Sequence, residues 1–264
     1  MIFQVQDGCF GYGGRPVLRD INFSIPQGDV LAVLGPNGVG KTTLLRCMMG
    51  LLKWNGGCSS IDGHPLDEYK ATDIWKRIGY VPQAKANISS CTVREMVLLG
   101  RSSHLGLFSQ PSDEDWRLAD ESLEAVKMGS FAHQRCDRIS GGELQMALIA
   151  RALCTQPEML ILDEPESNLD FKNQLLILDT IRGLADQKGI SAVINTHYPA
   201  HALKISDQAL LLNRDLTNCC GKTSEIVSEC NMCRAFDVNV RIHECWYDGC
   251  RYQSVIPVSV ARTG

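Results

Sequence analysis

A glycine-rich loop lies between an apolar run and a helical segment near the start of the chain. The run Asp29–Leu34 reads Asp-Val-Leu-Ala-Val-Leu, a composition that suits a strand covered on both of its faces. The loop Gly35–Thr42 follows it directly, and Thr43–Met49 continues with apolar positions at helical spacing. A strand, a glycine loop and a helix in this order predict a parallel sheet whose loop presents backbone N–H groups at a helix start.

The loop itself has the composition of a phosphate-binding loop. Its glycines allow backbone N–H groups to close around phosphate oxygens, Lys41 adds a positive charge, and the Thr42 hydroxyl can ligate Mg²⁺. An ordinary strand-to-helix turn does not need this combination, which arises by chance in roughly one chain in a hundred of this length. The residues expected to bind the nucleotide phosphates are Gly35, Pro36, Asn37, Gly38, Val39, Gly40, Lys41, Thr42 and Thr43.

Two acidic residues follow a second apolar run. The run Met159–Leu162 reads Met-Leu-Ile-Leu, and Asp163 and Glu164 come directly after it. We expect Asp163 to hold the water shell of Mg²⁺ and Glu164 to polarise an attacking water. A strand that ends in a polar turn would also place an acidic residue here, but two in succession are less common.

The overall composition excludes some classes of function. The chain has 264 residues and a net charge of -4, which gives no global attraction to nucleic acid, so no nucleic-acid partner is expected. No apolar run approaches the roughly 20 residues that span a bilayer, and Met1–Phe10 lacks the pattern of a signal peptide. We therefore expect a cytosolic protein whose 12 cysteines are mostly reduced.

Hydrophobic periodicity divides the rest of the chain. Ile2–Ile25 alternates between glycine-containing turns, which predicts short antiparallel strands. Ala192–Thr196 is a third buried-strand candidate, so the core is expected to be α/β with a parallel sheet. A helix before it is expected to bury a stripe of Leu175, Leu178, Ile181 and Ala185. From Ala84 to Gln156 strand signals are absent, and a helical insertion is predicted from apolar positions that include Val93, Met96, Val97, Leu123 and Val126.

A second helix start with glycines precedes the acidic pair. In Ile139–Arg151, Ser140 and Glu143 have the spacing of a capping box, and Gly141 and Gly142 lie between them. Such a helix end is a second phosphate-binding surface. A chain with one ATP site needs only one such surface, and the glycine loop already supplies it. We expect it to cap the γ-phosphate held by the loop of another copy, although a purely structural cap is the alternative.

With these motifs in sequence order, the chain resembles the ATP-binding-cassette family from about Phe3 to Leu212. Ile139–Glu143 resembles the family's signature motif, and Asn168–Asp170 resembles its dimer-contact loop. Gln83 and His197 resemble its switch glutamine and switch histidine, and Tyr12 resembles the aromatic residue on which adenine stacks. Taken singly, a histidine at a strand end is more often structural, and Tyr12 would be interpreted as a turn residue.

The resemblance implies a fold and an activity. The fold is an α/β P-loop NTPase (RecA-like) parallel-sheet core with an N-terminal antiparallel β lobe and a helical subdomain. The ATPase domain is expected at 1–212, with the helical subdomain at about 84–157 and a cysteine-rich extension at 213–264. The chain would hydrolyse ATP with Mg²⁺ as a head-to-tail pair of copies that sandwiches two ATP molecules.

Site roles follow from the same resemblance. The expected catalytic residues are Glu164, His197, Gln83 and Lys41, and the expected Mg²⁺ ligands are Thr42, Gln83 and Asp163. The nucleotide is further expected to contact Tyr12, Ser140, Gly141, Gly142, Glu143 and Asp170. Two positions depart from the family pattern: Glu143 replaces the more common Gln, which the capping box accommodates, and Glu166 stands where Thr is usual.

Three segments resemble ATPases that serve uptake of iron chelates, haem, cobalamin and related metal complexes: 93–101, 104–111 and 195–203. This resemblance implies two permease subunits in the membrane, a solute-binding protein that acts indirectly, and a peripheral location at the cytoplasmic face. Residues just after Gln83 would form the groove that holds the permease.

A soluble ATPase of iron–sulfur cluster assembly is the alternative, because Cys230 and Cys233 have a metal-like spacing. Cys219, Cys220, His243, Cys245 and Cys250 lie around this pair in the sequence. Against a metal site, Asp237–His243 and Tyr252–Pro257 have the pattern of an ordinary hairpin. DNA-repair and translation relatives fit less well, and the motif from Ser140 to Glu143 excludes a phosphate-loop kinase.

Overall fold

The computed structural model describes residues 1–84, 90–106 and 109–261. The chain forms two compact units, one of residues 1–68 and 193–264 and one of residues 69–192. Each unit contains buried hydrophobic side chains. In the part of the chain that the structure describes, no helix is long and apolar enough to cross a membrane. The expected domain boundary at residue 212 stays a prediction.

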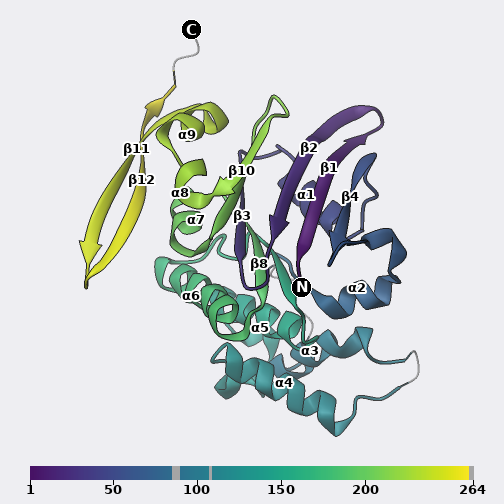
Figure 1. Cartoon of the computed structure of the whole chain (residues 1–264). Helices are drawn as coiled ribbons and strands as arrows, with labels where there is room; N and C mark the ends of the chain where they lie inside the picture. The colour runs from purple at the N-terminus through teal and green to yellow at the C-terminus, as the bar shows by residue number, and fades with distance from the viewer. Residues whose placement is uncertain (85–89, 107–108, 262–264) are drawn as a thin grey trace. The chain divides into compact units, whose positions relative to one another are not determined.

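The first unit begins with an antiparallel sheet (Figure 1). Its strand order is β2-β1-β4-β5. The first two strands are 10 and 11 residues long, so the prediction of short strands here was wrong; Gly13 and Gly14, with φ angles of 55° and 83°, make a single tight turn between them. The bounds are β1 (Phe3–Tyr12), β2 (Arg15–Ile25), β4 (Gly56–Ile61) and β5 (His64–Pro65).

A parallel strand pair forms the other half of this unit. β3 (Val30–Leu34) is buried at every residue, as predicted for a strand covered on both faces. It pairs in parallel with β9 (Gln208–Leu212), and β10 (Asn218–Lys222) pairs antiparallel with β9. The helices here are α1 (Lys41–Met48) and α7 (Pro199–Ile205), and the chain enters the unit within β8 (Ser191–Asn195).

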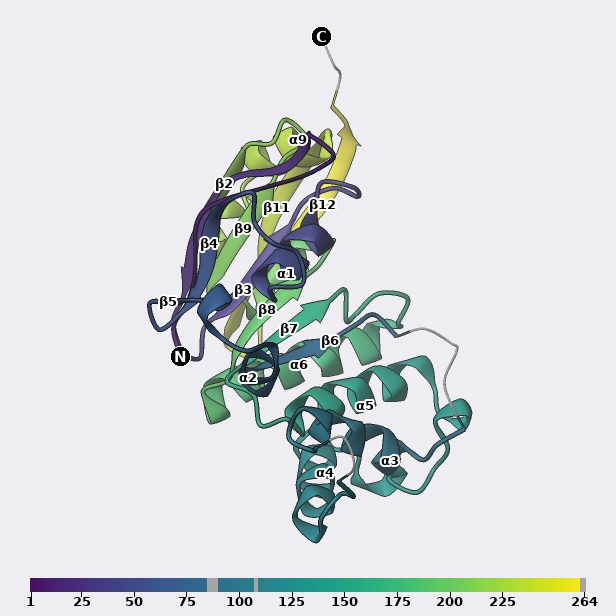
Figure 2. The ribbon, with the colours of Figure 1, turned by 90° about the vertical axis from the view of Figure 1, so that its right-hand side faces the viewer.

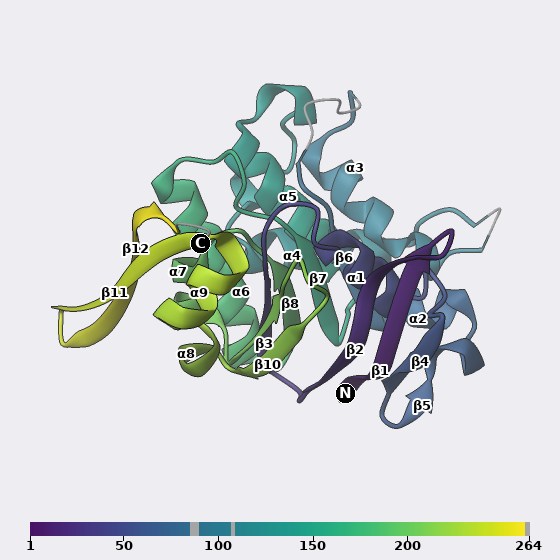
Figure 3. The same cartoon turned by 90° about the horizontal axis from the view of Figure 1, so that it is seen from above.

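The C-terminal segment adds two short helices and a hairpin, seen beside α7 in Figures 1 and 3. The helices are α8 (Thr223–Ile226) and α9 (Glu229–Phe236). β11 (Val238–Tyr247) pairs antiparallel with β12 (Cys250–Val260) where the sequence pattern indicated a hairpin. Trp246 and Tyr247, at the tip, are 72% and 74% exposed.

The second unit combines two parallel strands with a group of helices (Figure 2). β6 (Ile78–Val81) pairs in parallel with β7 (Met159–Asp163). The described part of the predicted helical insertion contains α-helices and 3₁₀ turns, and all five of its predicted apolar positions are buried. The helices are α2 (Ala71–Arg77), α3 (Val93–Leu98), α4 (Asp113–Ala125), α5 (Gly141–Leu153) and α6 (Phe171–Lys188), with short 3₁₀ turns at η2 (Leu99–Ser103), η3 (Gly129–Phe131) and η4 (Cys136–Arg138).

One predicted core position on α6 was wrong. Leu175 is 48% exposed, and the buried face begins instead at Gln174 and continues through Ile177, Leu178 and Ile181. Gln174 turns inward because its Nε2 donates a hydrogen bond to the Glu166 carbonyl at 3.3 Å. The buried face of α6 therefore includes a hydrogen-bonded amide at this end.

A buried ion pair joins three elements of the second unit. Arg101 in η2 contacts Asp115 in α4 at 2.9 Å, and its Nη1 donates to the Cys154 carbonyl beyond α5 at 3.1 Å. The Ser112 backbone N–H and the Arg101 guanidinium, both donating to the Asp115 carboxylate, lower the pKa of Asp115 to about 2.

We expect Asp115→Ala to lower the free energy of unfolding by about 3 kcal/mol, because the Arg101 charge would stay buried without its carboxylate. Urea unfolding followed by circular dichroism measures this change. Glu121→Ala is the matched control, since Glu121 pairs with Arg117 on the exposed face of the same helix and its loss should leave the midpoint unchanged. Equal midpoints for both variants would contradict a structural role for the pair.

Candidate functional site

The glycine loop between β3 and α1 is shaped by conformations that other residues rarely adopt. Gly40 is the N-cap of α1 with a φ of 107°, and no side chain caps the helix. A Cβ on Gly35, whose φ is 145°, would lie 2.6 Å from the Leu212 carbonyl oxygen. The positive end of the helix dipole lies at the loop, and no acidic residue in the first turn of α1 neutralises it.

Lys41 is buried within its own loop. Its side chain is 5% exposed, and its Nζ donates hydrogen bonds to the carbonyls of Gly35 at 2.7 Å and Pro36 at 3.1 Å. These carbonyls replace the water that the ammonium loses on burial. An arriving phosphate can replace them in turn.

His197 lies next to this lysine in the first unit. Its Nδ1 is 3.2 Å from the Lys41 Nζ, and it follows Thr196, whose backbone N–H donates to the Val33 carbonyl at 3.2 Å. Because an ammonium group only donates, Nδ1 is the acceptor and the ring proton is on Nε2. The Nε2 atom of His197 is thus a hydrogen-bond donor.

Tyr12 ends β1 and is 49% exposed. Its ring packs edge-to-face against Phe10, with centroids 4.9 Å apart and planes at 86°. That contact fixes the ring. A flat base can stack on such a ring.

In the second unit the acidic pair ends β7. Asp163 is the last residue of the strand, and Glu164 follows with a φ of 51°, a left-handed conformation that is uncommon for a non-glycine residue. The Ser167 hydroxyl donates to the Glu164 carboxylate at 3.1 Å and orients it. Sequence reasoning missed Ser167, and its only signal was a hydroxyl three residues after the acid.

Glu166 is fully buried. Glu166 is one of the two positions that depart from the family pattern, and it is therefore a buried residue and not a solvent-exposed charge.

The predicted capping box at the start of α5 is confirmed. The Ser140 side chain accepts from the Glu143 backbone N–H, and the Glu143 carboxylate accepts from the Ser140 backbone N–H at 2.7 Å. A Cβ on Gly142 would lie 2.5 Å from the Asn173 side chain, and one on Gly141 would lie 3.6 Å from Leu169. The helix start thus lies against the first turn of α6 and the loop that leads into it.

A hydrogen bond holds the end of the loop that precedes α6. Asp170 caps α6, accepting a hydrogen bond from the Asn173 backbone N–H at 2.8 Å, and Asn168 has a φ of 62°. Asp170 and the start of α5 therefore share one neighbour, Asn173.

Gln83 follows β6 and is half-buried. The Gln145 side chain of α5 contacts the backbone on both sides of it, accepting from the Ala84 N–H at 3.0 Å and donating to the Pro82 carbonyl at 3.4 Å. Sequence reasoning did not find Gln145, because a glutamine in a helix gives no local signal.

The predicted residues fall into two groups. The glycine loop, Lys41 and His197 come together in the first unit. Gln83, the acidic pair, the start of α5 and Asp170 belong to the second unit. Among residues 1–84, 90–106 and 109–261, no group of three or more His, Cys, Asp or Glu is placed to hold a metal ion. Cys233 donates to the Asn239 side chain at 3.5 Å, and Cys230 is exposed.

A family model described as ABC transporter matches residues 18–167, more than half of the chain. The chain belongs to the ABC transporter family. The predicted fold class is confirmed, and the chain is an ATP-binding ATPase of the kind that is coupled to transport.

Relatives and solved structures in the ABC transporter family match most of the chain. A probable iron chelatin transport ATP-binding protein of Helicobacter pylori is 35% identical over 224 residues, covering 80% of this chain and 86% of the relative. The molybdate import ATP-binding protein MolC of Haemophilus influenzae is 31% identical over 242 residues, with coverage of 92% and 90%.

Two solved structures are similar. A transporter described as of the metal-chelate ABC type, in an inward-facing conformation, has a TM-score of 0.87 and 30% identity, covering 97% of both chains. A dimeric ATP-binding cassette in a post-hydrolysis state with ADP and Pi has a TM-score of 0.70 and 26% identity, covering 84% of this chain and 99% of that one.

We expect Tyr12→Ala to weaken ATP binding by about 1–3 kcal/mol, or about 5- to 150-fold, because one base–aromatic stack is lost. GTP should weaken similarly, since stacking does not read base edges. Isothermal titration calorimetry measures both affinities, and Tyr12→Phe is the control that keeps the ring. An unchanged ATP affinity for the alanine variant would return Tyr12 to the role of a turn residue.

Proposed function

We propose that this ABC transporter subunit hydrolyses ATP as a head-to-tail pair and drives an importer for a metal complex such as an iron siderophore, haem or cobalamin. The observation that carries the paired mechanism is the presence of two glycine-flanked helix starts in one chain, at α1 and α5. Import is preferred over iron–sulfur assembly because the two curated relatives compared above are named as transport proteins.

The glycine loop would bind the ATP phosphates. The Lys41 ammonium would then exchange its hydrogen bonds to the Gly35 and Pro36 carbonyls for bonds to the outer phosphates. The Thr42 hydroxyl, the Gln83 amide oxygen and the Asp163 carboxylate would hold Mg²⁺; these hard oxygen donors are the ligands that this ion prefers. Bound Mg²⁺ neutralises charge on the phosphate oxygens.

Hydrolysis requires a water to attack the γ-phosphate, which releases ADP and inorganic phosphate. Glu164 would accept a proton from this water, and Ser167 would hold the carboxylate in position. The Nε2–H of His197 would donate a hydrogen bond to a γ-phosphate oxygen and stabilise the negative charge that is redistributed there.

The partner copy would supply the second phosphate surface. Ser140, Gly141 and Gly142 would present the start of their α5 to the γ-phosphate, with Asp170 in the contact loop beside them. The dimeric cassette structure with ADP and Pi supports a pairing of this kind.

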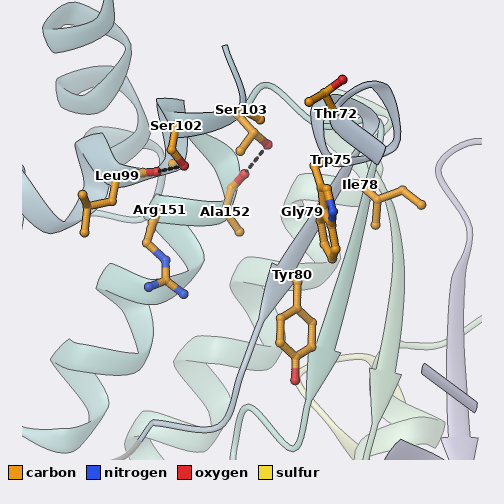
Figure 4. Close-up of a pocket in the computed structure, with 12 residues that line it drawn as sticks. Thr72, Trp75, Ile78, Gly79, Tyr80, Leu99, Ser102, Ser103, Arg151 and Ala152 are labelled. Atoms are coloured by element: carbon orange, nitrogen blue, oxygen red, sulfur yellow. Dashed lines mark hydrogen bonds between the residues drawn. The ribbon is translucent and has the colours of Figure 1, made fainter. Parts of the chain in front are cut away.

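The permease would dock on a groove in the second unit. This groove of about 560 Å³ is formed by α2, β6, η2 and the end of α5 (Figure 4). The sequence had placed docking just after Gln83; of those residues Ala84 is described, and 85–89 lie outside the described residues. Docking there would hold the subunit at the cytoplasmic face of the membrane, with a solute-binding protein as an indirect partner.

We expect partial activity when two inactive chains are mixed, one carrying Lys41→Ala and the other Gly141→Glu. The second change adds a negative charge where the γ-phosphate would lie, and Gly141 has room for a side chain, whereas Gly142 is closed by Asn173. With random pairing and independent sites, about a quarter of wild-type ATPase activity should return, because half of the pairs keep one intact composite site.

Gly183→Glu is the control, since it places the same side chain in open space on α6 and should leave activity intact. Phosphate release measures the rates. Full activity of the Gly141→Glu chain alone, or no recovery in a mixture shown by mass to contain mixed pairs, would contradict the composite site.

A further inference from the structure

Three sulfur atoms lie together in the second unit, where the chain enters α3. The Cys91 and Cys136 Sγ atoms are 4.0 Å apart, and the Cys136 Sγ is 4.0 Å from the Met96 Sδ. Cys136 and Met96 are buried, with 2% and 4% of their surface exposed, whereas Cys91 is half-buried. The cluster therefore has two interior residues and one residue that solvent can reach.

Backbone hydrogen bonds hold the two cysteines opposite one another. Thr92 and Arg135 form an antiparallel β-bridge, and beside it the Cys136 N–H donates to the Cys91 carbonyl at 3.0 Å. The Val93 N–H donates a second hydrogen bond across the same bridge, at 2.9 Å. The approach of the two thiols is thus set by the backbone and not by side-chain rotation alone.

The capped start of α3 adds Met96 to this pair. Thr92 is the N-cap of α3 and forms a capping box with Glu95. Cys91 therefore lies just before the cap and Met96 is the fourth residue of the helix, and side chains at these two positions commonly pack together as a hydrophobic staple. The thioether and both thiols thus belong to one locally defined arrangement.

Two other roles for the cluster are packing and a disulfide. Soft side chains pack well in a core, which would account for all three. A disulfide needs its sulfurs at about 2.05 Å, so the Cys91 and Cys136 Sγ atoms would have to approach to about half of their present distance. Burial also raises the pKa of the Cys136 thiol to about 12, which opposes its reaction with oxidants, because these attack thiolates.

The sulfur spacing fits a metal ion with three donors in one plane. Three sulfurs that each lie about 2.3 Å from a central ion are about 4.0 Å from one another, which is the spacing of both sulfur pairs. Thiolates and thioethers are soft donors, which favour Cu(I). A tetrahedral Zn²⁺ site would need a fourth ligand, and in the described parts of the chain no group of three or more His, Cys, Asp or Glu is placed to hold a metal ion.

We propose that Cys91, Cys136 and Met96 bind one Cu(I) ion. The two thiols release their protons to solvent and the thioether binds as a neutral donor, so the occupied site carries one net negative charge. Cys91 follows Gln83 by eight residues. Cys136 precedes Ser140, the N-cap of α5, by four. The ion therefore joins the segment after Gln83 to the segment that leads into α5, and this inference does not depend on the importer function.

The first arm of the test measures Cu(I) affinity by competition with the chelator bicinchoninate, using the reduced full-length chain without oxygen. The parent chain carries Cys230→Ser and Cys233→Ser, which removes the other pair with a metal-like spacing. Cys91→Ser should weaken binding at least about 100-fold, since the loss of an outer-shell partner alone costs about 10- to 100-fold. Met96→Leu conserves volume and should weaken it about tenfold. Cys58→Ser is the control, because Cys58 is a half-buried cysteine of the first unit.

The second arm counts the sulfur ligands by X-ray absorption at the copper edge. The parent chain should show three sulfurs at about 2.3 Å from the copper, and Met96→Leu should show two. Cys91 is half-buried and leucine replaces methionine with little change of volume, so both variants should fold. If the three side chains only pack, neither the affinity nor the sulfur count depends on them.

Three results would overturn the proposal. The parent chain could fail to hold Cu(I) against the chelator, Cys91→Ser could bind it as tightly as Cys58→Ser, or the sulfur count could be the same in the parent and in Met96→Leu. A disulfide between Cys91 and Cys136 that forms with oxidised glutathione, in a chain whose reduced pair holds no Cu(I), would assign the pair a redox role instead.

Discussion

The hydrogen bonds from the Lys41 ammonium to the Gly35 and Pro36 carbonyls hold the glycine loop in the shape on which the nucleotide site depends. A buried cation must keep polar partners, so the loop closes around its lysine until phosphate oxygens replace those carbonyls. The same ammonium fixes the tautomer of His197 by donating to Nδ1. Glycine is required at positions 35 and 40, because their φ angles and close contacts exclude a side chain.

α5 connects three features of the second unit. Its capping box presents Gly141 and Gly142, its residue Gln145 contacts the backbone on both sides of Gln83, and Arg151 near its end lines the groove. A 13-residue helix is a rigid element about 20 Å long. A displacement of its start by a γ-phosphate would therefore move both the Gln83 segment and the floor of the groove, which is the proposed docking site of the permease.

Local signals made much of the site predictable. The glycine loop, the acids after β7 and the capping box of α5 each depend on neighbours within a few residues, and the fold class followed from their order. The contacts of His197 with Lys41, of Ser167 with Glu164 and of Gln145 with Ala84 depend on side-chain directions and tertiary packing, which one sequence does not encode locally. Leu175 was misplaced because the buried face of α6 begins with a polar residue, Gln174, which a hydrophobic pattern does not identify as buried.

The most direct test of the paired mechanism is the mass of the Glu164→Gln chain in Mg²⁺ and ATP, measured by light scattering after gel filtration. Without its base the chain should bind ATP but hydrolyse it about 10²- to 10⁴-fold more slowly, so the sandwich should accumulate. The account predicts a species of twice the 29.1 kDa chain mass with two bound ATP molecules. A chain that stays at 29.1 kDa with ATP bound, or that hydrolyses ATP near the wild-type rate, would contradict it.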